Sequence, residues 1–295
     1  MNDAPSTPLS VRNAIDTVLA QAAVPALSHT ADTFKTGDPD APLTGIVTTF
    51  LATADVIRQA ADQGANLIIT HEPTFYSAED TDDLSWLEGD PVYQAKRRLI
   101  EDHGMVIWRF HDYWHMMRPD GIVTGLANLM GWTVDPPAVS MHDVMQMQAM
   151  TAGNGWDKRI AGAATGIATI PETSLVDLAR QLKDRLGAAS VRMIGPDDLS
   201  VRRVGLTLGA LPGKMTIATL QRDDVDVVIS GETREWETCE FLRDAEAFGR
   251  PKGMLVVGHA LSEEPGMAYL AEWLRPLCPG VPVTHIPCGD PFRTV

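Results

Sequence analysis

The chain has 295 residues, of which 44% are hydrophobic and 21% are charged. This composition is typical of a globular protein with one large or two modest hydrophobic cores, and it argues against long disordered regions. The formal net charge is −15. Because no basic stripe is visible that could neutralise phosphates, neither nucleic acid nor an anionic membrane surface is an expected partner.

The sequence shows no signal for secretion or membrane insertion. The N-terminal residues lack a basic stretch followed by an apolar one, and no apolar run reaches the roughly 18 residues of a membrane helix. The three cysteines, Cys239, Cys278 and Cys288, form no C-x-x-C pair. We therefore expect a cytoplasmic protein with free thiols, and a bridge between Cys278 and Cys288 is the alternative.

The N-terminal third alternates helices and strands. Residues 10–23 have an amphipathic helical pattern, with Ser10 as a good N-cap. Three segments then follow in the order strand, helix, strand: residues 46–50, 53–64 and 65–70. This order predicts a βαβ unit, with parallel strands and a right-handed crossover.

An acidic segment, residues 77–90, comes next and carries six carboxylates. It predicts a loop that is mobile over residues 79–90, either as a plain solvated loop or as a lid over a site. Beyond it the pattern predicts a helix that begins on Pro91, a buried strand and another helix. These elements cover residues 91–104, 105–110 and 124–132.

The remaining chain continues the alternation of strands and helices. In the middle, an amphipathic helix over residues 174–188 lies between strand-like residues 161–170 and 201–210. The tail predicts strand, helix, strand, helix, strand over residues 225–232, 233–250, 253–260, 266–277 and 281–287. The chain is therefore expected to be an α/β protein with two lobes.

Three of the predicted strands end in side chains that bind metals. These side chains are His71, Glu72, His111, His115, His259 and Glu263. Ligands bind beyond the carboxyl ends of strands in open α/β sheets, and imidazole and carboxylate groups suit zinc, iron and manganese. A single such residue at a strand end more often makes a structural hydrogen bond than binds a metal, and we expect a structural role for His103 and His285. The recurrence in separate βα units is what predicts a metal site.

Several of these stretches also match a known family. They are T-H-E-P at residues 70–73, the H-D-Y-W-H segment with the glycine-rich helix after it, D-V-V-I-S-G-E at 226–232, G-H-A-L-S-E at 258–263 and D-P-F at 290–292. On these motifs the chain resembles the Nif-three-like family, also called the GTP cyclohydrolase I type 2 family of dinuclear-metal proteins. It would be a variant with T-H-E-P in place of T-H-H-P. The match covers residues 35–130 and 225–292.

The resemblance implies a Nif-three-like fold. In that fold two α/β lobes with mixed sheets flank a metal-binding cleft that holds two divalent metal ions. It implies that residues 1–135 together with 225–295 form the metal-binding part, and that residues 136–224 form a middle α/β segment. It also implies a homo-oligomer, with a hexamer as the family's frequent assembly.

The family's ligands can be carried over residue by residue. They correspond here to His71, Glu72, His115, His259 and Glu263. Glu72 stands where the family has a histidine, and His115 stands where it has an aspartate. A further family histidine is Trp236 here. The expected cofactor is therefore a pair of divalent ions, zinc, manganese or iron, in a site of altered geometry.

These residues predict a metal-dependent hydrolase that acts on a small molecule. Glu232 and His111 are the candidates for moving protons, although Glu232 equally suits a helix N-terminus. The family name suggests a cyclic amide or a similar C–N bond as the substrate. No motif for a serine triad or a phosphate loop offers a rival chemistry.

Three other interpretations stay open. The protein could be a non-catalytic metal-binding scaffold or partner-binding protein, which the family's "interacting factor" name suggests. It could carry a structural metal site, although the candidate ligands include none of the cysteines that such sites favour. It could also be a relative that has lost its metals.

Overall fold

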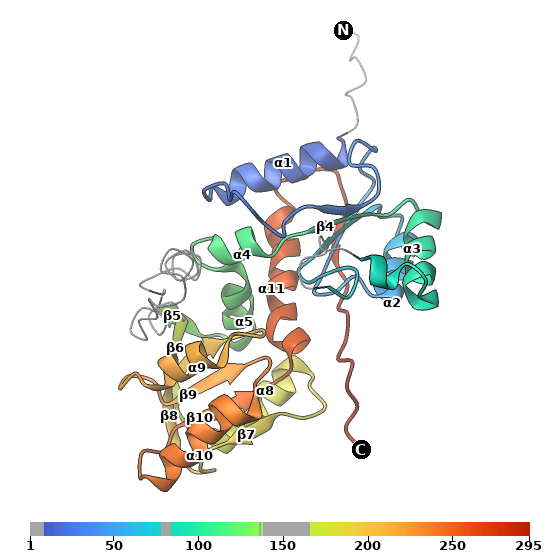
Figure 1. The fold of residues 1–295 in the computed structure, drawn as a ribbon. Coiled ribbons are helices and arrows are strands. Elements are labelled where there is room, and N and C mark those ends of the chain that lie inside the picture. Colours follow the sequence, from blue (N-terminus) through green and yellow to red (C-terminus); the bar gives the residue numbers. More distant parts are fainter. Residues whose placement is uncertain (1–8, 78–83, 136, 138–165) are drawn as a thin grey trace. The chain divides into compact units, whose positions relative to one another are not determined.

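The structure is a computed structural model that describes residues 9–77, 84–135, 137 and 166–295 (Figure 1). The chain divides into two compact units. Unit 1 comprises Met1–Met117 and Met267–Cys288, and unit 2 comprises Arg118–Gly266 and Gly289–Val295. Each unit is built on its own β-sheet, so the predicted α/β class with two mixed sheets is confirmed.

The sheet of unit 1 has five strands in the order β1-β4-β3-β2-β11. All neighbours are parallel except the edge pair of β1 and β4. The strands are β1 (Phe34–Thr36), β2 (Ile46–Thr49), β3 (Leu67–Thr70), β4 (Val106–Arg109) and β11 (Val283–His285). The predicted parallel βαβ unit is therefore confirmed, and the four parallel strands end at one edge of the sheet.

Three helices of unit 1 begin directly after a capping side chain, and two of these caps, Ser10 and Thr53, were predicted. The caps are Ser10, Thr53 and Asp90, whose side chains accept hydrogen bonds from backbone amides of the first turn. The helices are α1 (Val11–Ala22), α2 (Ala54–Asp62), α3 (Pro91–Asp102) and the short α4 (Asp112–Met116).

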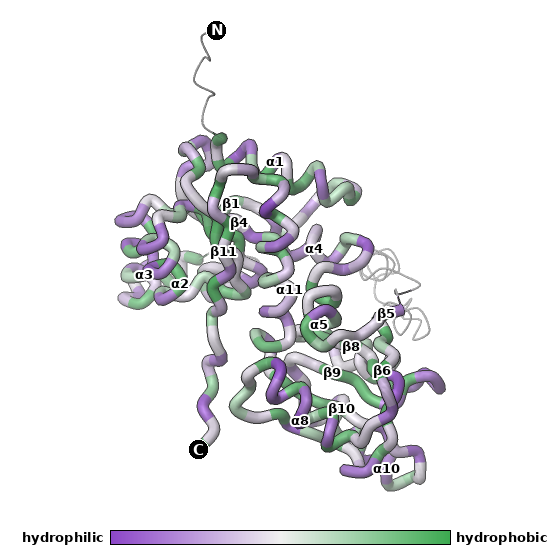
Figure 2. Tube along the Cα trace, turned by 180° about the vertical axis from the view of Figure 1, so that it is seen from behind, coloured by the Kyte–Doolittle hydropathy of each residue, from purple (hydrophilic) through white to green (hydrophobic). Residues whose placement is uncertain are grey.

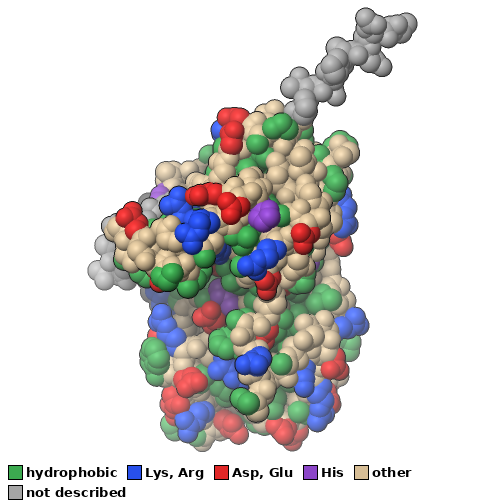
Figure 3. Space-filling model, turned by 90° about the vertical axis from the view of Figure 1, so that its right-hand side faces the viewer, with side chains coloured by type: hydrophobic (Ala, Val, Ile, Leu, Met, Phe, Trp, Pro, Cys, Tyr) green, Lys and Arg blue, Asp and Glu red, His purple; other side chains and the backbone are tan. Residues whose placement is uncertain are grey.

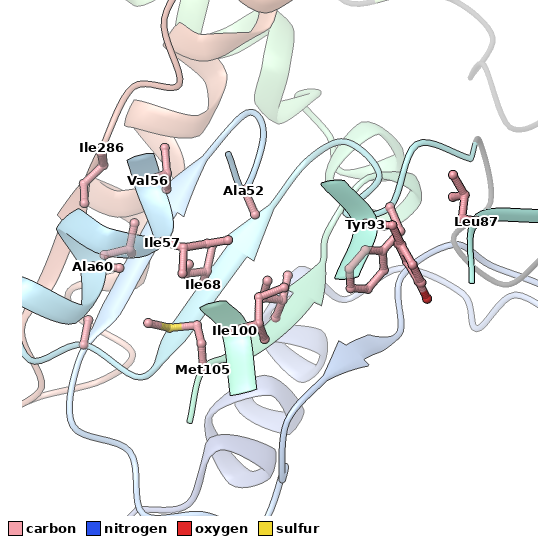
Figure 4. Close-up of a cluster of buried hydrophobic side chains, with 14 residues drawn as sticks. Ala52, Val56, Ile57, Ala60, Ile68, Leu87, Tyr93, Ile100, Met105 and Ile286 are labelled. Atoms are coloured by element: carbon pink, nitrogen blue, oxygen red, sulfur yellow. The ribbon is translucent and has the colours of Figure 1, made fainter. Parts of the chain in front are cut away.

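Helices α2 and α3 cover one face of this sheet. Figure 4 shows Val56 and Ile57 of α2 and Ile100 of α3 packed around Ile68 of β3, all of them buried. Every residue of β2, β3 and β4 is buried, and the chain around β4 is predominantly hydrophobic in Figure 2. Because a parallel sheet buried on both faces is rigid, it holds the residues that follow its strands in fixed positions.

The sheet of unit 2 has six strands in the order β5-β6-β8-β9-β10-β7. Its centre, β8, β9 and β10, is parallel, and the outer pairings are antiparallel. The strands are β5 (Thr133–Asp135), β6 (Gly166–Ser174), β7 (Arg192–Ile194), β8 (Ser200–Thr207), β9 (Val227–Ser230) and β10 (Gly253–Val256).

The helices of unit 2 connect these strands. They are α5 (Gly121–Met130), α8 (Leu175–Leu186), α9 (Gly213–Leu220), the π-helix η2 (Glu235–Cys239) and α10 (Glu240–Ala247). The last helix, α11 (His259–Leu274), contributes to both units, because the division falls between Gly266 and Met267.

The sequence did not predict every element. The edge strands β1, β5 and β7 have three residues each, too few to show the alternation that marks a strand. Helix α9 starts on Gly213 after Pro212 and has no side-chain cap, so its start signal is weak. The predicted helix over residues 233–250 is a π-helix followed by an α-helix.

Two of the predicted segments are described only in part. Residues 166–224 of the middle segment supply strands and helices of unit 2, in one sheet with β9 and β10. The other residues of that segment, except 137, and residues 78–83 of the acidic segment lie outside the described residues. In the rest of the acidic segment, Ser85–Leu87 form a single 3₁₀ turn. The domain boundaries and the mobility of the loop therefore stay predictions.

Cys239, Cys278 and Cys288 form no disulfide bond, as expected. Within the described ranges, none of the helices is long and apolar enough to cross a membrane. On the face shown in Figure 3, acidic and basic side chains are interspersed.

Candidate metal centre

The first cluster of candidate residues lies in unit 1, where strands β3 and β4 end side by side. Thr70 and Arg109, their last residues, are paired in the parallel register. Beyond β3 the chain turns sharply, and the backbone amides of His71 and Glu72 both donate to the carbonyl of Phe50. The Thr70 hydroxyl also donates to that carbonyl. Residues 71 and 72 are thus held firmly at the carboxyl edge of the sheet.

Three imidazoles meet at this edge. His71 follows β3, His111 is the N-cap of the short helix α4 after β4, and His115 lies in the last turn of that helix. The ring centroid of His71 lies 4.6 Å from that of His111 and 5.0 Å from that of His115. One nitrogen of each ring lies within 4.8 Å of those of the other two. Three imidazole nitrogens at this separation suit a zinc-type ion.

The hydrogen bond of His71 fixes which nitrogen faces the cluster. Its ring is fully buried, and Nδ1 lies 3.1 Å from the carbonyl oxygen of Phe110. Because a carbonyl only accepts, Nδ1 carries the proton and Nε2 keeps its lone pair. Burial, followed by the nearby His111 and His115, lowers the pKa of His71 well below its usual value. His71 is therefore neutral, which is the form that binds metals.

A buried carboxylate positions the other two histidines. Asp32 accepts hydrogen bonds from the backbone amides of His111, Asp112 and Tyr113, at 2.7, 3.0 and 2.8 Å. It therefore caps the first turn of α4, and burial raises its pKa. Asp32 was not predicted as a cap, because a capping residue in a distant loop leaves no local pattern in the sequence.

A second carboxylate orients the ring of His111. The Nδ1 atom of His111 lies 2.9 Å from Asp112, whose other oxygen accepts from the hydroxyl of Thr30 and the amide of Ala31. Burial would raise the pKa of Asp112, but the hydrogen bonds from His111, Thr30 and Ala31 outweigh it and lower that pKa. An ionised Asp112 thus accepts a hydrogen bond from the Nδ1–H of His111, which directs Nε2 toward the cluster.

Glu72 faces a buried arginine. The guanidinium of Arg109 donates to Glu72 Oε2 at 3.2 Å and to the carbonyl of His71 at 2.9 Å. The other oxygen of Glu72 lies 3.9 Å from His111 Nε2. Arg109 was not among the predicted site residues, although an arginine inside the apolar run V-I-W-R-F is a signal of a buried polar role.

The second cluster lies in unit 2, beyond strands β9 and β10. His259 is the first residue of α11, and its Nε2 lies 3.1 Å from the carboxylate of Glu263, one helical turn later. Its Nδ1 lies 2.9 Å from Glu232, which follows β9. Glu232 thus orients His259 as Asp112 orients His111. A histidine and a carboxylate that converge in this way are common metal ligands.

The loop after β8 lies directly against this cluster. Gly209 has a φ of +67°, and a Cβ there would lie 2.2 Å from Glu263 and 3.3 Å from His259 Nε2. Its amide donates to the hydroxyl of Ser262, which in turn donates to the carbonyl of His259. Only glycine therefore fits beside the pair. This role of Gly209 was not predicted, because its one signal in the sequence is a glycine at the end of a strand.

The structure thus brings the predicted residues together within each unit. Unit 1 gathers His71, Glu72, His111 and His115, and unit 2 gathers Glu232, His259 and Glu263. Which of these residues are ligands and which are catalytic stays a prediction.

The other residues singled out by the sequence have different surroundings. Trp236 lies on the π-helix with 74% of its surface exposed. His103 is the C-cap of α3, and His285 is hydrogen-bonded to the carbonyl of Thr48 within the sheet.

Comparison with known sequences gives a family match. A sequence model described as Duf34/NIF3 (NGG1p interacting factor 3) matches residues 12–289. A Clostridium perfringens protein named "GTP cyclohydrolase 1 type 2 homolog" is 22% identical over 243 residues, which cover 81% of this chain and 80% of that protein. A Clostridium acetobutylicum protein of the same name is 22% identical over 197 residues, 67% of this chain and 66% of that one.

Solved structures share the fold. A Bacillus cereus protein related to NIF3 has a TM-score of 0.75 at 15% identity, and it covers 98% of this chain and 100% of its own. A Staphylococcus aureus hypothetical protein has a TM-score of 0.72 at 16% identity with the same coverage. With the family model spanning nearly the whole sequence and the same fold in these structures, the chain belongs to the Duf34/NIF3 (NGG1p interacting factor 3) family.

Proposed function

We propose that the protein is a divalent-metal-dependent hydrolase that acts on a small molecule. The observation that carries this proposal is the group of three imidazoles in unit 1, whose nitrogens lie within 4.8 Å of one another. Three histidines leave room for water and substrate, as catalytic sites require, whereas structural zinc sites are closed and rich in cysteine. A divalent ion bound there supplies an acidified water and polarises the bond under attack.

We propose two ions for each chain, zinc, manganese or iron. His71, His111 and His115 would hold one of them, and His259 with Glu263 would take part in holding the other. The donor chemistry supports this assignment, since all of these groups are imidazole or carboxylate. His111, which the sequence suggested as an acid or base, is better suited to bind metal because one of its nitrogens lies within 4.8 Å of those of His71 and His115.

The remaining polar groups would orient the ligands and move protons. Asp112 and Glu232 each hold the Nδ1 side of a histidine, which leaves Nε2 as the donor atom. The side chain of Glu232 is 59% exposed. It can therefore also exchange protons with solvent, which supports its predicted role as an acid or base.

A cyclic amide or a similar C–N bond is the proposed substrate class. Its support is the name of the Clostridium relatives, "GTP cyclohydrolase 1 type 2 homolog", since a cyclohydrolase opens a ring at such a bond. The reaction would be hydrolysis, in which water adds to the carbon and the ring nitrogen leaves with a proton.

The proposal is tested by metal-dependent turnover. The purified chain, loaded in turn with zinc, manganese and iron, is assayed against cyclic amides, lactones and phosphoesters. We expect turnover of a cyclic amide that a chelator abolishes and added metal restores. Bound metal without turnover of any compound would favour the metal-binding scaffold instead, and a chain that binds no metal would contradict both.

A further inference from the structure

Residues 27–33, between α1 and β1, are hydrogen-bonded to the start of α4, and we call them the clamp. The side chain of Asp32 is buried, and both of its carboxylate oxygens accept from backbone amides at the start of α4. In the opposite direction, Asp112 of α4 accepts from the amide of Ala31 and the hydroxyl of Thr30. Each side thus supplies a carboxylate that binds the other side, so the two segments hold each other.

Helix α4 depends on this support because it is short. It runs only from Asp112 to Met116, and a single helical turn is unstable alone, since it fixes many backbone angles for few hydrogen bonds. The buried ring of Trp114 anchors the helix by packing against Trp273. The clamp fixes the start of the helix, where His111 is the N-cap. The clamp therefore helps to set the positions of His111 and of the imidazole one turn later.

The clamp and α4 also bring two negative charges close to the imidazoles. Asp32 accepts amide hydrogen bonds on both oxygens, as an ionised carboxylate does, and Asp112 is ionised as well. Among the residues that the structure describes, neither carboxylate is paired with a lysine or an arginine. A divalent ion held by the imidazoles would offset these charges, because buried charges attract each other more strongly than charges in water. Metal binding and attachment of the clamp to α4 therefore favour each other.

We infer that the clamp is a positioning element of the metal site in unit 1, with Asp32 as its central residue, and that metal binding locks the clamp onto α4. Asp32 binds backbone amides of α4, so it acts through the helix and not as a ligand. Coupling between two sites is reciprocal. The factor by which the clamp raises metal affinity therefore equals the factor by which metal stabilises the attached clamp. The inference rests on the metal site of the proposed function, but not on turnover.

Hydrogen exchange of the full-length chain tests this coupling. The amides of Leu27 and Ala31 donate to side chains of α4, so their exchange rates report on whether the clamp is attached. We expect zinc to slow both rates by about tenfold or more, the size of effect that outer-shell partners have on metal affinity. The internal control is the amide of Val92, which donates to the side chain of Asp90 at the exposed start of α3. Its exchange rate should be the same with and without zinc.

His115→Ala shows which zinc site acts on the clamp. With this imidazole removed from the cluster of unit 1, zinc should no longer slow the exchange of Leu27 and Ala31. Zinc bound by the cluster of unit 2 would remain in this variant. Its presence therefore separates an effect of the site in unit 1 from a general effect of bound metal.

Asp32→Asn tests the coupling from the other side. The side-chain oxygen of asparagine can still accept from His111 and Asp112, whose amides share one oxygen of Asp32. Its NH₂ group then faces the amide of Tyr113, so that hydrogen bond and the negative charge are lost. The zinc affinity of the site in unit 1, measured by competition with a chelator, should fall by about 10- to 100-fold. The matched control is Asp90→Asn, which changes the capping carboxylate of α3 and should leave the zinc affinity unchanged.

Three results would overturn the inference. The first is an exchange rate of Leu27 and Ala31 that zinc leaves unchanged or slows no more than that of Val92. The second is a slowing that persists in His115→Ala. The third is an unchanged zinc affinity in a folded Asp32→Asn.

The exchange of the unmodified chain decides alone if Asp32→Asn does not fold. Zinc protection of the clamp in a protein without turnover would contradict the hydrolase and leave the inference intact. Turnover in a protein whose clamp zinc does not protect would contradict the inference and leave the hydrolase intact.

Discussion

At the scale of single residues, the hydrogen-bond acceptors at the Nδ1 atoms of the histidines determine in which direction each Nε2 atom points. Asp112 and Glu232 lie 2.9 Å from Nδ1 of His111 and His259. The equivalent acceptor for His71 is a backbone carbonyl, so no side-chain substitution removes it. The two carboxylates are therefore the positions where ring orientation can be tested without removal of a ligand.

The first prediction concerns Asp112→Asn. The amide keeps the size of the side chain but loses the charge that fixes the Nδ1 proton of His111, so zinc affinity should fall by about 10- to 100-fold. Isothermal titration with zinc measures this effect. The control is Asp177→Asn, which changes an exposed carboxylate that pairs with Arg180 and not with a histidine. Equal affinities in Asp112→Asn and the unmodified chain would show that Asp112 has no role in binding.

A second prediction concerns Gly209→Ala. The new methyl group would meet the carboxylate of Glu263 at 2.2 Å, so the carboxylate must move and metal binding by unit 2 should be lost. Gly64→Ala is a matched control, because Gly64 has a similar φ of +72° but nothing lies within 4 Å of its Cβ position. Both variants bear the strain of a left-handed alanine, about 1 kcal/mol. If metal binding fell equally in Gly209→Ala and Gly64→Ala, backbone strain and not contact with Glu263 would be the cause.

Among the elements, the crossing of α5 and α11 in unit 2 depends on two glycines. A Cβ on Gly125 would lie 2.3 Å from the carbonyl of Pro265 and 2.4 Å from the Cα of Gly266. A Cβ on Gly266 would lie 2.6 Å from the backbone of Ile122. These obstacles are backbone atoms, so the helices could not accept a side chain without moving apart.

The third prediction follows for Gly125→Ala. In an ordinary helix this change stabilises by about 1 kcal/mol, because alanine is the better helix former. Here overpacking should reverse the sign and destabilise unit 2 by about 1–3 kcal/mol. Urea unfolding followed by circular dichroism measures the change, and a gain in stability would contradict the backbone contact. An unchanged stability in Gly89→Ala, where nothing lies within 4 Å, serves as the control.

At the scale of the whole molecule, we propose that the chain forms a homo-oligomer, with a hexamer as the expected assembly. The proposal comes from the family, and the sequence adds little to it. Light scattering should therefore give a molar mass several times that of the 32.0 kDa chain, and six times that mass for a hexamer. A mass of one chain over a wide range of concentrations would contradict it.

The sequence by itself determined the local structure and the chemistry of the candidate residues. Caps such as Ser10 and Thr53 and the apolar periodicity behind them predicted helix starts to within a residue. Apolar runs likewise predicted that His71 and His259 follow strands, although His259 also begins α11, which starts earlier than the predicted helix over 266–277. These signals are readable because each depends on residues that are neighbours in the chain.

The tertiary structure alone decided which groups these residues meet. Asp32 caps α4 from about 80 positions away in the sequence. Arg109, at the end of β4, donates to Glu72, which follows the neighbouring strand β3. The close approach of Gly209 to Glu263 likewise joins distant segments. Such pairings leave no local pattern, because the partners become neighbours only when the sheet has formed and its strands have taken their register. The charge and orientation of every candidate ligand therefore depend on the fold.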